Sequence, residues 1–321
     1  KRQECGVFAV WAPEEDVAKL TFYGLFALQH RGQEAAGIAV GDGHQTIVFK
    51  DLGLVNQVFD EQTLQAMRGN VAIGHTRYST TGATTWENAQ PMFRSIGEDT
   101  GVALAHNGNL VNTTALKRRA VQLGIMPENE LAGCASDTDV VASLLAHTAV
   151  NGGLEEAALH LLPKVEGAFC FVMCDTDTIY AARDPYGVRP LSLGRLDRGW
   201  VVASETCALD IVGASYVRDI EPGEFVTINA TGVHSRRFAE PRHARCVFEH
   251  VYLARPDSFL NGRSVNAARV EIGRSLAREH PCDGDLVIPV PESGTPAAVG
   301  YAQESGIPFA QGLTCLLYTS D

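Results

Sequence analysis

Cys5 is a candidate nucleophile because it opens an apolar run, Cys5 to Ala12, behind only four polar residues. A cut after Glu4 would give this residue a free α-amine beside its thiol. An α-amine titrates near about pH 8 and serves as the general base of N-terminal nucleophiles. The pattern therefore predicts acyl-transfer chemistry at Cys5, and its alternative is an inert packing cysteine on a buried strand.

Four further residues have the chemical types that acyl transfer from an amino acid needs. Asn107 and Gly108 follow a short apolar run and offer a side-chain amide and an unshielded backbone N–H to an oxyanion. Arg77, at a strand end, and Asp137, at a helix start, match a substrate carboxylate and ammonium group. Each has a structural alternative: a turn for Asn-Gly, a surface charge for Arg77 and a helix N-cap for Asp137.

Hydrophobic periodicity predicts the elements that must position these residues. Strands are expected at 5–12, 37–40, 46–50, 71–76 and 102–105, the last stopping at the turn sequence 106–109. Helices are expected from residue 17 to near residue 32 and over 138–149. An antiparallel meander and a hairpin should follow, with strands at 167–174, 178–183, 190–195 and 199–204 and a turn at 229–232.

From residue 263 the pattern changes to alternating helices and strands. Helices are predicted at 263–280 and 295–305, and strands at 285–289 and 308–313. Strand–helix–strand order is typical of a parallel α/β unit. The sequence therefore predicts an α+β domain followed by the opening of an α/β domain.

Composition limits the classes of partner. The 321 residues carry 26 basic and 38 acidic side chains, a net charge of −12, which argues against nucleic acid as a main partner. No apolar run approaches a membrane span, and no secretory signal is visible. The eight cysteines form no CxxC pair, which is typical of reduced thiols. We therefore expect a cytoplasmic protein without a membrane or nucleic-acid partner.

Several ordered stretches resemble the class II, or N-terminal-nucleophile, glutamine amidotransferases. They are CGVFAVW (5–11), LQHRGQEAAGI (28–38), GHTRYSTTG (74–82), AHNGNLVN (105–112), ASDTDVV (135–141), EGAFCFV (166–172), ARDPYGVRPL (182–191) and VVASETCALD (201–210). Within this class, three later stretches resemble the amidophosphoribosyltransferase family. They are FEHVYLARPDS (248–258), VNAARVEIG (265–273) and residues 285–309, which resemble the first βαβ of a type I phosphoribosyltransferase domain.

The resemblance implies a four-layer αββα sandwich followed by an incomplete α/β domain. The implied division is a propeptide remnant at 1–4, a glutaminase domain at 5–235, a linker at 236–262, a partial phosphoribosyltransferase domain at 263–313 and an atypical tail at 314–321. The diphosphate-binding segment of a phosphoribosyltransferase is not in the sequence. We therefore expect this C-terminally truncated chain to support at most the glutaminase half of the reaction.

The resemblance also implies an activity. Glutamine would be hydrolysed to glutamate, and the ammonia would displace pyrophosphate from phosphoribosyl pyrophosphate to give 5-phosphoribosylamine, the first step of de novo purine synthesis. By the same resemblance, Cys5 is the nucleophile and Asn107 and Gly108 form the oxyanion hole. Arg77 would hold the α-carboxylate of glutamine and Asp137 its α-amine. Thr80 would add a hydroxyl from a loop, 78–85, that closes over the substrate.

Cofactors and assembly follow from the resemblance for the full-length protein. Cys246 falls where many members carry one ligand of a 4Fe–4S cluster, and Ser293 where the family's magnesium site draws one ligand; a helix N-cap is the alternative for Ser293. Neither cofactor is expected in this fragment, and full-length members are commonly homotetramers. His30 and His75 are predicted to be structural, because the α-amine transfers the proton in this pattern.

Two alternatives remain open at this stage. The chain could belong to another class II amidotransferase, hexosamine- or asparagine-forming. It could also be a catalytically silent glutamine-binding module in which Cys5 stays blocked.

Overall fold

The computed structural model describes residues 5–78, 85–97, 100–128 and 136–314. The chain divides into two compact units, residues 1–245 and 246–321, and each is described by itself. Among the described residues, no helix is long and apolar enough to cross a bilayer.

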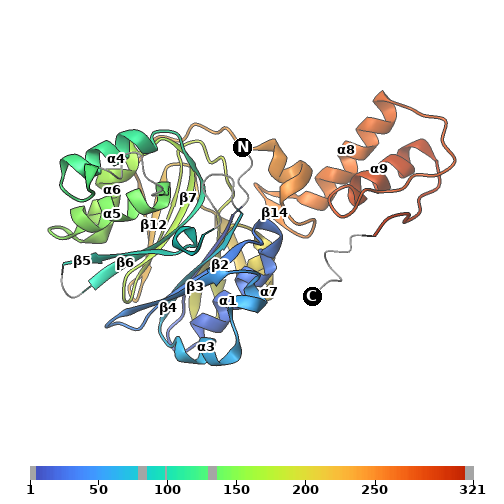
Figure 1. Cartoon of the computed structure of the whole chain (residues 1–321). Coiled ribbons are helices and arrows are strands. Elements are labelled where there is room, and N and C mark those ends of the chain that lie inside the picture. Colours follow the sequence, from blue (N-terminus) through green and yellow to red (C-terminus); the bar gives the residue numbers. More distant parts are fainter. Residues whose placement is uncertain (1–4, 79–84, 98–99, 129–135, 315–321) are drawn as a thin grey trace. The chain divides into compact units, whose positions relative to one another are not determined.

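Two antiparallel sheets form the centre of the first unit (Figure 1). Sheet A has the order β11-β9-β10-β1-β4-β2-β3. Its strands are β1 (Gly6–Trp11), β2 (Ala35–Gly41), β3 (Thr46–Leu52), β4 (Val71–Arg77), β9 (Ser192–Leu196), β10 (Gly199–Ala203) and β11 (Ser215–Asp219). Sheet B has the order β13-β12-β8-β7-β6-β5. Its strands are β5 (Met92–Ile96), β6 (Thr100–Leu110), β7 (Gly167–Cys174), β8 (Ile179–Arg183), β12 (Glu224–Asn229) and β13 (Gly232–Arg237).

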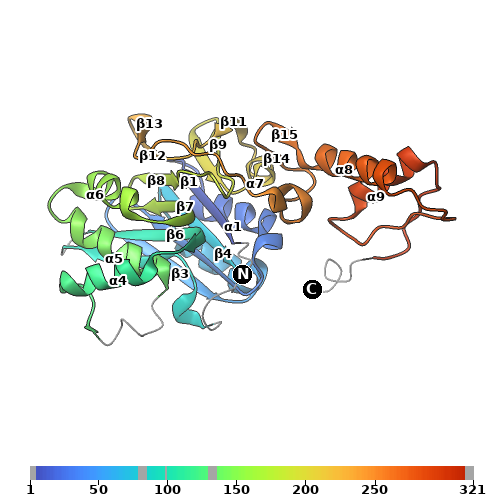
Figure 2. The same cartoon turned by 90° about the horizontal axis from the view of Figure 1, so that it is seen from above.

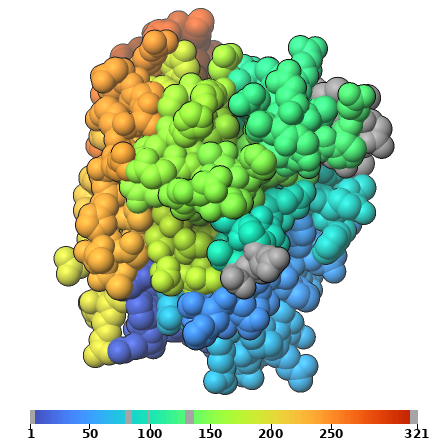
Figure 3. Space-filling model, turned by 90° about the vertical axis from the view of Figure 1, so that its left-hand side faces the viewer, coloured from blue at the N-terminus to red at the C-terminus, as the bar shows by residue number. Residues whose placement is uncertain are grey.

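Helices cover the outer face of each sheet (Figures 1 and 2). Sheet A carries α1 (Val17–Ala27), α2 (Val55–Val58), α3 (Glu61–Ala66) and α7 (Thr206–Ile211). Sheet B carries α4 (Thr113–Gln122), α5 (Asp137–Ala149) and α6 (Gly153–Leu161). Figure 3 views the unit from the side of this second helix layer, which is coloured green.

Three separate hydrophobic cores hold these layers together. In β1, Phe8 packs toward the helices over sheet A, whereas its neighbour Val7 packs between the two sheets. Phe169 and Leu145 belong to the core between sheet B and its helices. This division follows from the period-2 alternation of strand side chains, because both faces of each sheet are buried. The predicted four-layer αββα sandwich is confirmed.

The prediction that the strand at 102–105 stops at an Asn-Gly turn is wrong. β6 continues from Thr100 to Leu110 and pairs with β7, with Asn107 opposite Cys170 and Gly108 opposite Phe169. Pairing with a distant strand overrides the local turn preference of Asn-Gly.

The predicted single meander is also wrong, although its four strands exist. β7 and β8 pair in sheet B, but β9 and β10 belong to sheet A. The link between β8 and β9 is held by the buried Asp184, which accepts the N–H groups of Phe169, Tyr186 and Val188. The guanidinium of Arg183 donates to the carbonyls of Gly187, Arg189 and Ile220. These contacts hold the chain as it crosses from sheet B to sheet A. The turn residues between β8 and β9 had suggested that the two strands would pair in one sheet.

The second unit contains the two predicted helices, α8 (Val265–Glu279) and α9 (Thr295–Ser305). A short hairpin of β14 (Phe259–Leu260) and β15 (Arg263–Ser264) and a π-helical turn, η5 (Glu249–Leu253), precede them. The strands predicted at 285–289 and 308–313 reduce to one parallel bridge, Val287 to Phe309. Among the described residues of this unit, the two segments have no further neighbouring strand, and one pairing is too little to form a sheet.

The helices α8 and α9 touch through glycines. A Cβ at Gly273 would lie 1.9 Å from the carbonyl oxygen of Ala297, and one at Gly300 would lie 1.9 Å from that of Val270. Such distances require the helices to separate. These two glycines therefore set the distance between the helices.

We expect Gly273→Ala to destabilise the second unit by about 1–3 kcal/mol, because overpacking outweighs the gain of up to about 1 kcal/mol in helix propensity. Amide hydrogen exchange in α8 and α9 should accelerate. Gly284→Ala is the matched control, since its Cβ would meet nothing nearer than 3.7 Å. Equal exchange in both variants would contradict the prediction.

Candidate active site

Cys5 lies directly before β1 in the middle of sheet A, and the residue is only 7% exposed. Its Sγ donates to the carbonyl oxygen of Tyr78 at 3.8 Å, and its own carbonyl accepts from Arg31 Nε at 3.1 Å. Burial raises the pKa of the Cys5 thiol, and this effect exceeds the lowering by the charges of Arg77 and Arg31. The sulfur is thus a protonated thiol at neutral pH and needs a base before it can attack.

Arg77 lies beside this sulfur. It is the last residue of β4, which pairs with β1 so that Gly6 stands opposite Thr76. The residue is 6% exposed, and its Nη1 has no hydrogen-bond partner among the described residues. The surface-charge interpretation of Arg77 is therefore wrong, and a buried guanidinium nitrogen is left for an anion.

The side chain of Asn107 is fully buried, and within the described part of the chain neither its Nδ2 nor its Oδ1 has a hydrogen-bond partner. Leaving a buried polar group unsatisfied costs about 1–3 kcal/mol. An amide with neither atom bonded points to a ligand that completes it.

The backbone N–H of Gly108 lies on the edge of β6 that faces Gln90 and Asp137. The N–H of His106 donates to Gln90 Oε1 at 2.8 Å and that of Leu110 to Asp137 Oδ2 at 3.2 Å. Strand alternation places the N–H of Gly108 on this edge, between the other two. Gly108 has φ of 151°, and a Cβ would lie 2.1 Å from the carbonyl oxygen of Ala168, so only glycine fits.

Asp137 is the first residue of α5, while Ser136 is the N-cap and accepts the N–H of Asp139 at 3.2 Å. Burial raises the pKa of Asp137, but the His106 ring and the N–H groups of Leu110 and Thr138 outweigh it and hold the pKa at about 2. The carboxylate is therefore ionised, and its charge in turn raises the pKa of the Cys5 thiol. Asp137 is not the cap but an anion facing the site.

A hydrogen bond joins the two sheets at this site. His75 Nε2, on β4, lies 3.1 Å from the carbonyl oxygen of His106, on β6. Burial lowers the pKa of His75 to about 3, so the ring is neutral and Nε2 is the donor. This bond fixes β4, which ends at Arg77, against β6, which continues into Asn107.

A second set of residues supports Asp137. Gln90 Nε2 donates to Thr138 Oγ1 at 3.0 Å, and Thr138 Oγ1 lies 3.3 Å from His106 Nδ1. The ring of His106 lies 3.7 Å from Asp137 Oδ1. The start of α5 is thereby tied to β6.

Sequence reasoning missed a buried charge cluster behind Cys5, formed by His30, Arg31 and Glu205. His30 Nε2 and Arg31 Nη1 both contact Glu205 Oε1, at 2.8 and 2.5 Å. A signal was present for Glu205 alone, because it stands inside an otherwise uncharged, largely apolar stretch, 201–209, whereas His30 and Arg31 lie among other polar residues. The expectation that His30 is structural agrees with its contact to Glu205.

Two predicted segments lie outside the described residues. These are Thr80, with most of the predicted closing loop, and the predicted propeptide remnant, residues 1–4. Their roles stay predictions.

The candidate cofactor residues do not form a site. Cys246 is half-buried, and within the described ranges no group of three or more His, Cys, Asp or Glu side chains could hold a metal ion. The same holds around Ser293, which lies in the turn before α9. The residues present thus do not make up the donor set of a 4Fe–4S cluster or a magnesium ion.

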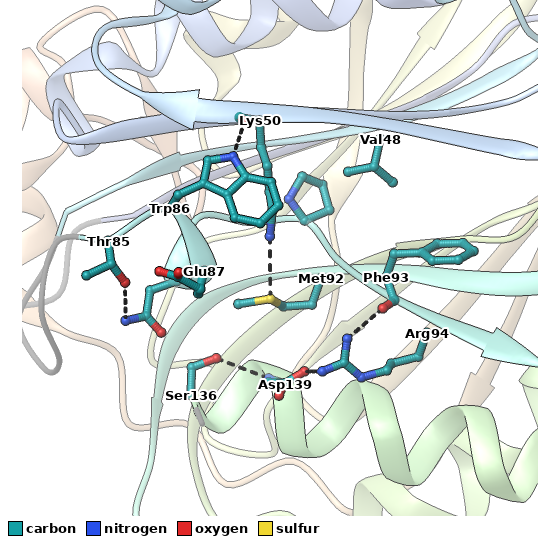
Figure 4. Close-up of a pocket in the computed structure, with 12 residues that line it drawn as sticks. Val48, Lys50, Thr85, Trp86, Glu87, Met92, Phe93, Arg94, Ser136 and Asp139 are labelled. Atoms are coloured by element: carbon teal, nitrogen blue, oxygen red, sulfur yellow. Dashed lines mark hydrogen bonds and ion pairs between the residues drawn. The ribbon is translucent and has the colours of Figure 1, made fainter. Parts of the chain in front are cut away.

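A pocket of about 640 Å³ lies near β3, β5 and the start of α5 (Figure 4). Its polar side chains already have partners: Lys50 Nζ donates to the carbonyl of Ala89 at 2.5 Å, and Arg94 pairs with Asp139. None of Cys5, Arg77, Asn107, Gly108 and Asp137 lines it. This pocket therefore lacks the chemistry of the candidate site.

Comparison with known proteins agrees with this geometry. Residues 75–210 match the family model of the glutamine amidotransferase domain. The amidophosphoribosyltransferase of Mycobacterium tuberculosis is 71% identical over 97% of this chain, and that of Bacillus subtilis is 42% identical over 97%. The chain spans 59% of the length of the Mycobacterium relative and 64% of the Bacillus one.

A solved structure shows the same fold. The B. subtilis glutamine phosphoribosylpyrophosphate amidotransferase complexed with ADP and GMP superposes with a TM-score of 0.88 at 42% identity. The superposition covers 96% of this chain and 66% of that one. The chain therefore belongs to the amidophosphoribosyltransferase family of class II glutamine amidotransferases.

Proposed function

We propose that the first unit hydrolyses glutamine to glutamate and ammonia at Cys5. In the longer protein, the ammonia displaces pyrophosphate from phosphoribosyl pyrophosphate and gives 5-phosphoribosylamine, the entry step of purine synthesis. Family membership supports the reaction. The observation that carries it in this chain is the buried side chain of Asn107, which is unpartnered among the described residues. It lies on β6, whose Leu110 N–H binds Asp137, and Asp137 and Arg77 both act on the charge state of the Cys5 thiol.

The first chemical step is attack by sulfur. Once residues 1–4 are removed, the free α-amine of Cys5 takes the Sγ proton, and the thiolate adds to the side-chain carboxamide carbon of glutamine. The raised pKa of the buried thiol makes this base necessary. Asn107 Nδ2 and the N–H of Gly108 stabilise the negative charge that develops on the carboxamide oxygen.

The second step releases ammonia. The ammonium form of the Cys5 α-amine returns its proton to the leaving nitrogen as the C–N bond breaks, which leaves a thioester on Sγ. Water, deprotonated by the same amine, then adds to the thioester carbon. Collapse of that intermediate frees glutamate and restores the thiol.

Substrate recognition uses two charges, the buried Arg77 and the half-buried Asp137. Arg77, whose Nη1 lacks a partner among the described residues, binds the α-carboxylate of glutamine, and the ionised Asp137 binds its α-ammonium group. Thr80 adds a hydroxyl to the same substrate. Both charged groups are in position before glutamine arrives, so binding costs little free energy of reorganisation.

We extend the proposal to the division of the chain and to its surroundings. Residues 5–235 act as the glutaminase domain, 236–262 as the linker, and 263–313 as part of a phosphoribosyltransferase domain, with 1–4 as a propeptide remnant and 314–321 as an atypical tail. The longer protein works in the cytoplasm as a homo-oligomer. Magnesium serves its phosphoribosyltransferase half, and any 4Fe–4S cluster would use Cys246 together with ligands outside this chain.

The chain that begins at Cys5 should hydrolyse glutamine at least about 100-fold faster than the chain that retains residues 1–4, because an amide nitrogen cannot act as a general base. Intact mass identifies the two forms, and glutamate release measures their rates. Cys5→Ala in the shortened form is the control and should be inactive. Equal rates in the two forms would refute the role of the α-amine.

Asn107→Leu should lower kcat for glutamine hydrolysis by about 100- to 1000-fold with little change in KM, because one oxyanion donor is lost. The same variant should unfold at a higher temperature, since it removes a buried amide that lacks partners in the described structure. Asn109→Leu, at an exposed position of the same strand, should change neither property. A normal kcat in Asn107→Leu would exclude Asn107 from the oxyanion hole.

Asp137→Asn should raise KM for glutamine by about 100-fold and reduce the preference for glutamine over glutaramate, which lacks the α-amine. With a pKa of about 2, Asp137 keeps its charge above that pH, so the wild-type KM should not rise from this group between pH 8 and pH 4. The matched control is Asp139→Asn, two residues along α5. Unchanged discrimination would show that Asp137 does not read the ammonium group.

A further inference from the structure

The main chain of the candidate nucleophile is held by a fully buried ion pair. Arg31 uses two parts of its guanidinium: Nε donates to the carbonyl oxygen of Cys5 at 3.1 Å, and Nη1 contacts Glu205 Oε1 at 2.5 Å. Neither side chain of this pair is exposed to solvent. A planar guanidinium can hold two acceptors in fixed directions, which a lysine ammonium cannot.

Glu205 is itself fixed in place. It stands directly before α7, just after β10, the strand that pairs with β1. His30 Nε2 contacts the same carboxylate oxygen at 2.8 Å, and Cys207 Sγ lies 3.8 Å from the other one. The carboxylate of Glu205 thus holds the guanidinium of Arg31 in a fixed position next to sheet A.

The position of this contact matters because of where Cys5 stands. Regular pairing of β1 begins at Gly6, opposite Thr76, and Val7 is anchored by Ser204 through its N–H and its carbonyl, both at 3.0 Å. In a chain that starts at Cys5, nothing precedes this residue to restrain it, and terminal residues fray unless they are tied down. Arg31 binds the carbonyl of Cys5, which connects the start of β1 to the thiol and the α-amine of the same residue.

From this geometry we infer that Arg31 is a positioning residue for the nucleophile, with Glu205 fixing the direction of its guanidinium. The inference rests on the proposed glutaminase function. The thiol and the α-amine of Cys5 branch from the same Cα, so holding the adjoining carbonyl orients both toward Asn107 and Gly108. Neither Arg31 nor Glu205 contacts the substrate in this role, so its loss affects turnover and not binding.

The test uses Arg31→Lys in the whole chain with Cys5 as first residue. Lysine keeps the charge but lacks the planar guanidinium that fixes the directions of both acceptors. We therefore expect kcat for glutamine hydrolysis to fall by about 10- to 100-fold, a typical cost of misplacing a reacting group. KM for glutamine should stay within about twofold, because Arg77 and Asp137 are untouched. Glu205→Gln, which leaves the guanidinium on Cys5 but removes its charged anchor, should shift kcat in the same direction and gives a second test where Arg31→Lys fails to fold.

A second readout does not depend on glutamine. Iodoacetamide labelling, located by mass spectrometry, should modify Cys5 several-fold faster in Arg31→Lys than in wild type, because a released terminal residue becomes accessible. Cys170 and Cys174, fully buried on β7, should stay protected. Arg218→Lys is the matched control: it alters another Arg–Glu pair, with Glu224 at 2.7 Å, far along sheet A, and should change none of these values.

The outcomes separate the possibilities. Wild-type kcat and wild-type labelling of Cys5 in both variants would overturn the inference. Labelling of Cys170 and Cys174 together with Cys5 would also overturn it, since Arg31 would then serve only the stability of the fold. If the wild-type chain does not hydrolyse glutamine, the proposed function fails, and the contrast in cysteine labelling still decides whether Arg31 holds Cys5.

Discussion

The hydrogen bond from His75 Nε2 to the carbonyl oxygen of His106 is the constraint on which the site depends. It joins the two sheets where β4 leads to Arg77 and β6 leads to Asn107. Because both histidines are buried, water does not compete for this bond, and a neutral His75 has one proton to give. The sheets cannot slide relative to each other at this point without losing it.

Around this bond the protein keeps polar groups that a fold alone does not need. The amide of Asn107 and the Nη1 of Arg77 are buried without partners in the described part of the chain. By contrast, the ion pair of Arg31 and Glu205 and the carboxylate of Asp184 are well bonded. The difference separates groups that hold the fold from groups that we propose bind the substrate.

Much of the fold could be predicted from sequence, because amphipathic patterns survive in the final structure. α9 begins and ends where the pattern predicted, and β2 and β3 contain the strands predicted at 37–40 and 46–50. The failures have tertiary causes. Asn107-Gly108 is a turn sequence only until β7 pairs with it, and β9 leaves the meander because Asp184 and Arg183 redirect the chain. In the part of the chain that the structure describes, the segment 285–289 has one bridge and lacks the further neighbours that a parallel sheet needs. The types of the site residues could be predicted from motifs. The ion pair of Arg31 and Glu205 joins positions 174 apart in sequence, so only the three-dimensional structure shows it.

The place of β1 within sheet A has a consequence for biosynthesis. Phe8 pairs with Gly74 of β4 on one side and with Ala203 of β10 on the other, so the first strand waits for a neighbour made almost two hundred residues later. Contacts of such long sequence range form late in folding. A growing polypeptide on the ribosome therefore completes the sheet around Cys5 only when most of the first unit has emerged, so the site that we propose for glutamine forms late in synthesis.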